Sequence, residues 1–204
     1  MQTALQALEL LREGNKRFAA GADRELQIDL QRRDQLVNGQ APFAVILGCS
    51  DARAPAEIIF DQGLGDLFVI RVAGNIVASS HIGTVEFAAE AFGTHLVVVL
   101  GHSHCGAIDA TLEQLRRPQE ARSPNLQSIV DRIRPAVEPI LKAAGDEEDI
   151  TRKAVRANVE RSVKQLSQGS RILQDLIDRK KLLVVGAEYC QESGLVDFFI
   201  GVPD

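Results

Sequence analysis

The 204-residue chain contains no tryptophan, and aromatic residues make up only 4% of it. No run of lysine and arginine stands beside aromatic residues, and the formal net charge is −5, so the positive surface of a nucleic-acid-binding protein is missing. No apolar run reaches the roughly 18 residues that a membrane-spanning helix requires. We therefore expect neither nucleic acid nor a membrane as a partner.

Cysteine is also scarce, with three residues in the chain. Charged residues such as Glu9, Arg12 and Lys16 interrupt the N-terminal segment, which therefore lacks the apolar core of a signal peptide. An odd number of cysteines without an export signal argues against a disulfide framework. We expect a cytoplasmic protein whose cysteines are buried thiols or metal ligands.

Short apolar runs bounded by glycine predict strands that are buried on both faces, as in a parallel sheet. They lie at residues 43–48, 67–72, 96–101 and 182–188. Helical stretches at 79–92 and 106–117 alternate with them, and residues 194–201 are a candidate edge strand. The sequence therefore predicts an α/β fold with a mainly parallel central sheet of about four to five strands flanked by helices.

One domain, residues 1–204, is expected, with an N-terminal helical arm at 1–40 and an α/β core at 41–204. The first helix is amphipathic and ends near Gly21, so its apolar stripe needs a partner surface. The polar stretch that follows is expected to be surface arm or short helix.

Residues 124–180 are predicted to be almost entirely helical. Pro135 and Pro139 are expected to kink one helix of this block or to divide it. No strand is followed by G-x-x-x-x-G-K-[ST] or G-x-G-x-x-G, which argues against a nucleotide-binding module.

Potential metal ligands follow two of the predicted strands directly. Cys49 comes after residues 43–48, and His102 and Cys105 come after residues 96–101. Ligand sites in open α/β sheets gather at the carboxyl ends of strands, so these loops are expected to meet. Two thiolates and an imidazole suit zinc and leave a fourth position open, as catalytic zinc sites require. For each residue alone, a buried side chain without metal is the alternative.

Four runs, GCSDAR (48–53), DQGLGDLFVIRVAGNIV (61–77), GHSHCGA (101–107) and REGNKRF (12–18), together resemble the β-class carbonic anhydrases. The resemblance covers nearly the whole chain and is densest from 43 to 107. It implies reversible hydration of CO₂ to bicarbonate and a proton. It also implies one Zn²⁺ per chain, held by Cys49, His102 and Cys105, with Asp51 and Arg53 as the catalytic pair.

The chemistry of Asp51 and Arg53 agrees with those roles. A guanidinium can hold a carboxylate through two parallel hydrogen bonds and keep it ionised, so Asp51 could orient the attacking water. The alternative is a salt bridge that only rigidifies the loop. If Arg53 lets go, Asp51 could become a fourth zinc ligand, as in some members of the family. Because two thiolates offset the charge of Zn²⁺, activity is expected to rise toward alkaline pH.

Further site residues are implied by the resemblance. Arg71 and Tyr189 match two positions of a bicarbonate pocket in the family's regulated subclass, but Ile46 stands where that pocket has tryptophan. Gln62 stands close to the position of a substrate-binding glutamine in the plant-like subclass. Gly106 could present its N–H to bicarbonate at a helix start, or could only permit a tight turn.

The remaining candidates receive structural interpretations. His104 is expected to point away from the metal, with a proton-shuttle role as the alternative. His81 and His95 are expected at the surface or at helix ends, and Cys190 is expected to be a free thiol. Residues 73–75 are expected to form a structural turn.

Two other functions stay open at this stage. The first is hydrolysis of a sulfur analogue of CO₂, such as COS or CS₂, on the same scaffold. The second is a non-catalytic zinc-stabilised binding protein, against which the Asp51 and Arg53 pair argues. The resemblance also implies assembly as a homodimer or homotetramer, with CO₂ and bicarbonate as the small-molecule partners.

Overall fold

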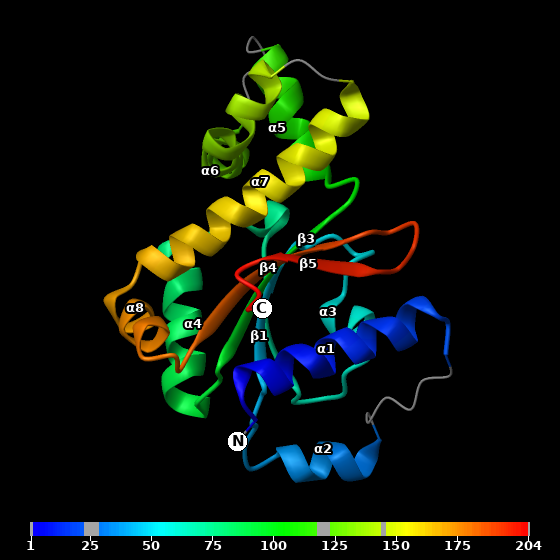
Figure 1. Ribbon diagram of the computed structural model, residues 1–204, viewed down its shortest axis with the longest axis vertical. Coiled ribbons are helices and arrows are strands. Elements are labelled where there is room, and N and C mark those ends of the chain that lie inside the picture. The colour runs from blue at the N-terminus through cyan, green and yellow to red at the C-terminus, as the bar shows by residue number, and fades with distance from the viewer. Residues whose placement is uncertain (1, 23–28, 118–122, 144–145, 204) are drawn as a thin grey trace.

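The computed structural model describes residues 2–22, 29–117, 123–143 and 146–203. Five strands form one sheet in the order β2-β1-β3-β4-β5 (Figure 1). They are β1 (Ala44–Gly48), β2 (Leu67–Arg71), β3 (Leu96–His102), β4 (Leu183–Tyr189) and β5 (Val196–Ile200). The first four run parallel, and β5 pairs antiparallel with β4 at one edge. The predicted α/β fold, with its edge strand, is confirmed.

Every residue of β1 and β3 is buried because helices cover both faces of the sheet. Successive side chains alternate between the faces, so Ile46 and Val98 lie in one apolar cluster while Val45 and Val97 lie in the other. Helices α1 and α3 cover the first face, and α4, α7 and α8 cover the second (Figure 1). They span Ala4–Ala19, Ala56–Ile59, Ser79–Phe92, Glu147–Gln168 and Arg171–Asp178.

Helix α1 is the expected N-terminal helix, and it packs on the core of the same chain. Thr3 caps the helix, and Leu8 and Leu11 are 1% and 0% exposed within the cluster that contains β1 and β3. The apolar stripe therefore finds its partner surface on the sheet of the same chain. The polar stretch after it contains the short helix α2 (Leu30–Leu36), while residues 23–28 lie outside the described part of the chain.

The helical block divides into α6 (Pro124–Lys142), α7 and α8, but not at its prolines. Pro135 and Pro139 both lie inside α6, on its exposed side, while Ile133 and Val137 face the core. Water can satisfy the carbonyl groups that each proline leaves without a helical donor, so the helix continues. Of the two expected outcomes, a kink or a division, the division is wrong because both prolines lie inside one helix.

Helix α5 (Gly106–Arg116) begins directly after the loop that follows β3. Within the described residues, no helix combines the length and the apolar character needed to cross a lipid bilayer.

Candidate metal centre

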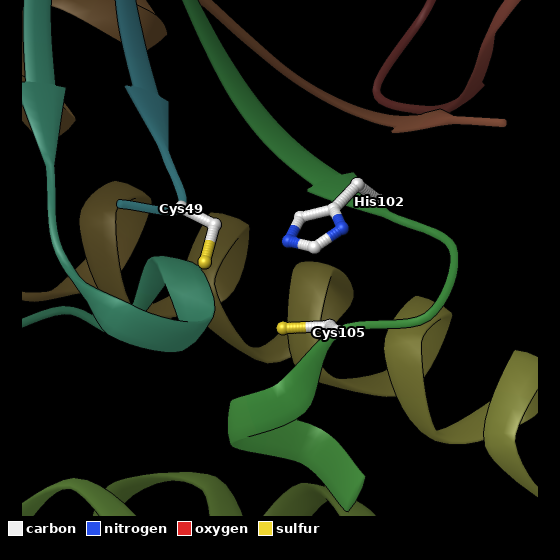
Figure 2. A group of neighbouring side chains, drawn as sticks. All are labelled: Cys49, His102 and Cys105. Atoms are coloured by element: carbon white, nitrogen blue, oxygen red, sulfur yellow. The ribbon is translucent and has the colours of Figure 1, made fainter. Parts of the chain in front are cut away.

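Cys49, His102 and Cys105 meet at the carboxyl ends of two adjacent strands. Cys49 follows β1, His102 is the last residue of β3, and Cys105 caps the start of α5. One potential ligand atom from each lies within 4.8 Å of the others. Figure 2 shows both sulfur atoms and one ring nitrogen directed toward a common space. The side chains predicted to converge are therefore brought together.

This centre is almost closed to solvent and fits a divalent cation. The three residues are 7%, 1% and 1% exposed, and Nε2 of His102 has no hydrogen-bond partner among the described residues. The His102 Nδ1 atom lies 2.8 Å from the Ser103 carbonyl oxygen, which accepts a hydrogen bond from Nδ1–H, so Nε2 carries the free lone pair. A buried nitrogen with a free lone pair beside two thiols is a donor set that zinc satisfies.

The two thiols differ in acidity. A hydrogen bond with the neighbouring Cys105 thiol lowers the pKa of Cys49, and the Gly74 N–H lowers it further. The same interaction between the two cysteines raises the pKa of Cys105. Without a cation, the first thiolate to form therefore opposes ionisation of the second. A divalent cation offsets that repulsion, so metal binding and loss of both thiol protons are coupled.

A short 3₁₀ helix, η1 (Ala73–Asn75), supports Cys49 from the side. Gly74 donates its backbone N–H to the Cys49 sulfur at 3.3 Å and has a φ of 70°, which favours glycine. The buried side chains of Asn158 and Ser162 on α7 donate to the Gly74 and Asn75 carbonyl oxygens at 2.8 and 3.0 Å. The predicted structural turn is confirmed, and it also reaches a candidate metal ligand.

Asp51 and Arg53 form the two-bond pair that the sequence predicts. Arg53 Nε and Nη2 donate to the two carboxylate oxygens of Asp51 at 2.9 and 2.7 Å, and Nη2 also donates to the His104 carbonyl oxygen at 3.1 Å. The Arg53 side-chain hydrogen bonds hold the pKa of Asp51 well below its usual range.

In this conformation the Asp51 carboxylate is bonded to Arg53 and is not part of the cluster of three candidate ligands. Its Oδ2 atom lies 3.8 Å from Nε2 of His102, so the carboxylate borders the centre. Its role as a fourth ligand after release by Arg53 stays a prediction.

Arg71, which the resemblance associates with a bicarbonate pocket, supports the metal-site loop here. From the end of β2 its Nε donates to the Cys49 carbonyl oxygen at 3.0 Å, and its Nη2 donates to the Asp51 carbonyl oxygen at 2.5 Å. Tyr189 is buried at the end of β4, with its ring 6.2 Å from Phe18, and Ile46 is buried within β1. The sequence does not predict the anchoring by Arg71, because that contact depends on how adjacent strands are aligned.

The two predicted substrate-binding residues lie in different places. Gly106 opens α5 directly after Cys105, and a Cβ atom added to it would meet no atom of the described residues within 4 Å apart from its chain neighbours and its own helix backbone. Packing within the chain therefore does not require glycine at this position. Gln62 follows α3, where its amide donates to the Phe60 carbonyl oxygen at 2.6 Å beside Gly14 of α1. Substrate binding by either residue stays a prediction.

His104 points away from the centre, as predicted. Its Nε2 contacts the Glu192 carboxylate, which also accepts hydrogen bonds from Ser103 Oγ and Cys190 Sγ, both at 3.2 Å. Hydrogen bonds from Cys190, from the backbone and from His104 lower the pKa of Glu192 to about 2. Cys190 is a half-buried free thiol, as expected.

The other two histidines also match their predictions. His81 lies in the first turn of α4, where its Nδ1 accepts the Ala78 N–H at 3.1 Å. His95 is half-buried, directly before β3, with Nδ1 2.8 Å from the Lys181 carbonyl oxygen.

The family model for carbonic anhydrase matches residues 44–196. Among relatives, the chain is 36% identical over 192 residues to "Carbonic anhydrase 2" of Mycobacterium tuberculosis, which covers 92% of this chain and 89% of the relative. The fold resembles a tetrameric β-carbonic anhydrase of Sordaria macrospora, with a TM-score of 0.71, 26% identity and coverage of 82% and 85% of the two chains. It also resembles a Coccomyxa β-carbonic anhydrase in complex with acetazolamide, with a TM-score of 0.73, 27% identity and coverage of 94% and 84%.

Proposed function

Since this chain belongs to the β-class carbonic anhydrases, we propose that it binds one zinc ion and uses it to hydrate CO₂ reversibly to bicarbonate and a proton. The ligands in this proposal are Cys49, His102 and Cys105. The observation that carries it is the convergence of two thiols and one unpartnered imidazole nitrogen beside an ionised carboxylate. Bound zinc would supply a Lewis acid that makes a water molecule nucleophilic, most effectively at alkaline pH because two thiolates offset the charge of the metal.

The protein's own contribution begins with the two cysteines. Their thiolates would balance the charge of the cation, within a nearly closed, apolar cluster that also contains Ile76 and Ile108. Three protein ligands would leave a fourth position for water, and Asp51 borders the centre with its Oδ2 atom 3.8 Å from His102 Nε2.

Asp51 orients the attacking water in this proposal. A carboxylate is an acceptor only, so Asp51 can take a hydrogen bond from the water and aim the water's lone pair at the carbon of CO₂. Arg53 keeps that carboxylate ionised and holds it away from the cluster through two hydrogen bonds. The released proton leaves to solvent, and Asp51 stays charged because its pKa is far below neutral pH.

We extend the proposal to assembly as a homodimer or homotetramer that acts on CO₂ and bicarbonate. Support comes from the Sordaria macrospora relatives, which are described as tetrameric. On this chain, Leu5 and Leu10 of α1 remain 57% and 40% exposed after the helix has packed on its own sheet. These side chains offer apolar surface for a second subunit.

Stopped-flow hydration of CO₂ by the zinc-loaded protein tests the reaction, with Cys49→Ser and Cys190→Ser compared side by side. Loss of an inner ligand should cost more zinc affinity than the roughly 10–100-fold that loss of an outer partner costs, so Cys49→Ser should lose both zinc and rate. Cys190→Ser should keep both, because the Cys190 sulfur contacts Glu192 and not the cluster. Zinc-loaded protein that hydrates no CO₂ would contradict the proposed reaction.

A further inference from the structure

The segment after β4 lies directly against the loop that carries His102. The Ser103 N–H donates to the Tyr189 carbonyl oxygen at 2.9 Å, and the Gln191 N–H donates to Ser103 Oγ at 2.9 Å. These two bonds on either side of Cys190 fix the backbone of Gln191 next to the candidate zinc ligand.

The Gln191 side chain reaches the ring of His102. Its amide group lies with Nε2 3.1 Å from His102 Nδ1, the same atom that lies 2.8 Å from the Ser103 carbonyl oxygen. A carbonyl oxygen can only accept, so Nδ1 carries the proton of this pair. The nitrogen and oxygen of a side-chain amide exchange places when the group turns by half a rotation about its last bond. Because Nδ1–H is a donor, the amide atom that bonds to it is the oxygen.

We propose that Gln191 is a positioning residue for the metal centre, whose amide oxygen shares the Nδ1 proton of His102 with the Ser103 carbonyl. This inference rests on the proposed zinc site. The Ser103 carbonyl belongs to the residue next to His102 and moves with its loop. Gln191 lies in the turn between β4 and β5, so its bond ties the ring to a different segment of the chain.

Two consequences follow for zinc binding. A proton held on Nδ1 keeps the Nε2 lone pair available, because the opposite tautomer would place a proton where the metal binds. A fixed ring plane also keeps Nε2 directed toward the two sulfurs. Loss of such an outer partner typically costs about 10–100-fold in metal affinity.

Zinc affinity of three variants, measured by competition with a chromophoric chelator, tests the proposal. Gln191→Leu keeps similar bulk but removes the acceptor, and should weaken zinc binding by about tenfold or more. Gln191→Glu keeps an acceptor at the same reach, and should bind zinc as tightly as the unsubstituted protein or more tightly. Ser193→Ala, at an exposed position of the same loop, should leave the affinity unchanged.

A second readout separates positioning from general support of the fold. Nitrogen-15 spectra of the zinc-loaded protein should show the His102 Nδ1–H protected from exchange with solvent, and this protection should fall in Gln191→Leu. Thermal unfolding of the zinc-free Gln191→Leu variant should match that of the unsubstituted protein.

Unchanged zinc affinity in Gln191→Leu would overturn the inference, and so would a Gln191→Glu variant that binds as weakly as Gln191→Leu. Cys49→Ser, run in the same assay, distinguishes this failure from failure of the zinc site. If Cys49→Ser binds zinc normally, the proposed site falls with the inference. If Cys49→Ser loses zinc while Gln191→Leu binds it normally, the proposed site stands and only the inference about Gln191 falls.

Discussion

The charge state of Asp51 is set by its neighbour Arg53. Its carboxylate receives two side-chain hydrogen bonds and one backbone N–H from Arg53, and the Arg53 side chain is the main cause of its lowered pKa. A carboxyl whose pKa is lowered is ionised at every pH above that value. Asp51 is therefore charged throughout the neutral and alkaline range, and its titration cannot produce a rise of activity there.

Asp51→Asn should lower CO₂ hydration by about 100-fold, the lower end of what a positioned acid or base contributes. The reason is that an amide presents a donor as well as an acceptor and cannot form the charged pair with Arg53. The loss should be the same factor at pH 7 and pH 9, because the group it replaces does not titrate between them.

Stopped-flow rates at both pH values, together with zinc content, check this expectation. Zinc content should not change, since Asp51 stands outside the cluster of ligands. A variant that has lost its zinc, or whose defect disappears at one of the two pH values, would show that Asp51 has a different role.

At the scale of elements, η1 links helix α7 to the metal centre. A Cβ atom on Gly74 would lie 2.7 Å from Ile133 Cδ1 and 3.1 Å from the Ala107 Cβ, at a φ of 70°. Gly74→Ala combines a left-handed backbone penalty of about 1–2 kcal/mol with overpacking of about 1–3 kcal/mol. We expect the free energy of unfolding to fall by about 2–5 kcal/mol and zinc affinity to weaken, because the N–H bonded to Cys49 moves.

Urea unfolding and chelator competition measure the two effects, with Gly83→Ala as the matched control. Gly83 lies inside α4, where an added Cβ atom would meet nothing within 4 Å, so alanine there should stabilise by up to about 1 kcal/mol. Equal behaviour of the two variants would show that η1 tolerates the extra atom and does not position Cys49.

The central strands were predictable because both of their faces are buried, which makes each strand a short, almost purely apolar run. The surface that α1 covers was not predictable. An amphipathic stripe shows that a helix packs on something, and Leu8 and Leu11 do not show whether that surface belongs to the same chain. The effect of Pro135 likewise depends on which side of α6 faces solvent.

The meeting of the candidate metal ligands was predictable because each lies at or shortly after the carboxyl end of a strand, where sheet geometry brings the loops together. The residues that support them were not. Asn158 and Ser162 bond to carbonyl groups 84 and 87 positions earlier in the chain. Their signal was weak, since it consists only of two polar residues spaced four apart on the otherwise apolar face of α7.

In the whole molecule, the sheet and its two layers of helices place the ligands before any metal is considered. Register fixes Gly48 of β1 opposite Leu100 of β3, and His102 opposite Tyr189 of β4. The three apolar clusters are built from side chains on both faces of the sheet and around α5 and α6. We therefore expect protein stripped of metal to keep its fold and to accept zinc again.

The most direct test of the account is to strip the protein of metal and to measure CO₂ hydration while zinc is added back in steps. The cluster of Cys49, His102 and Cys105 predicts a rate that rises linearly with zinc and stops rising at one zinc per chain. A hydration rate that is already maximal without zinc, or that is absent at one zinc per chain, would contradict a zinc-dependent carbonic anhydrase.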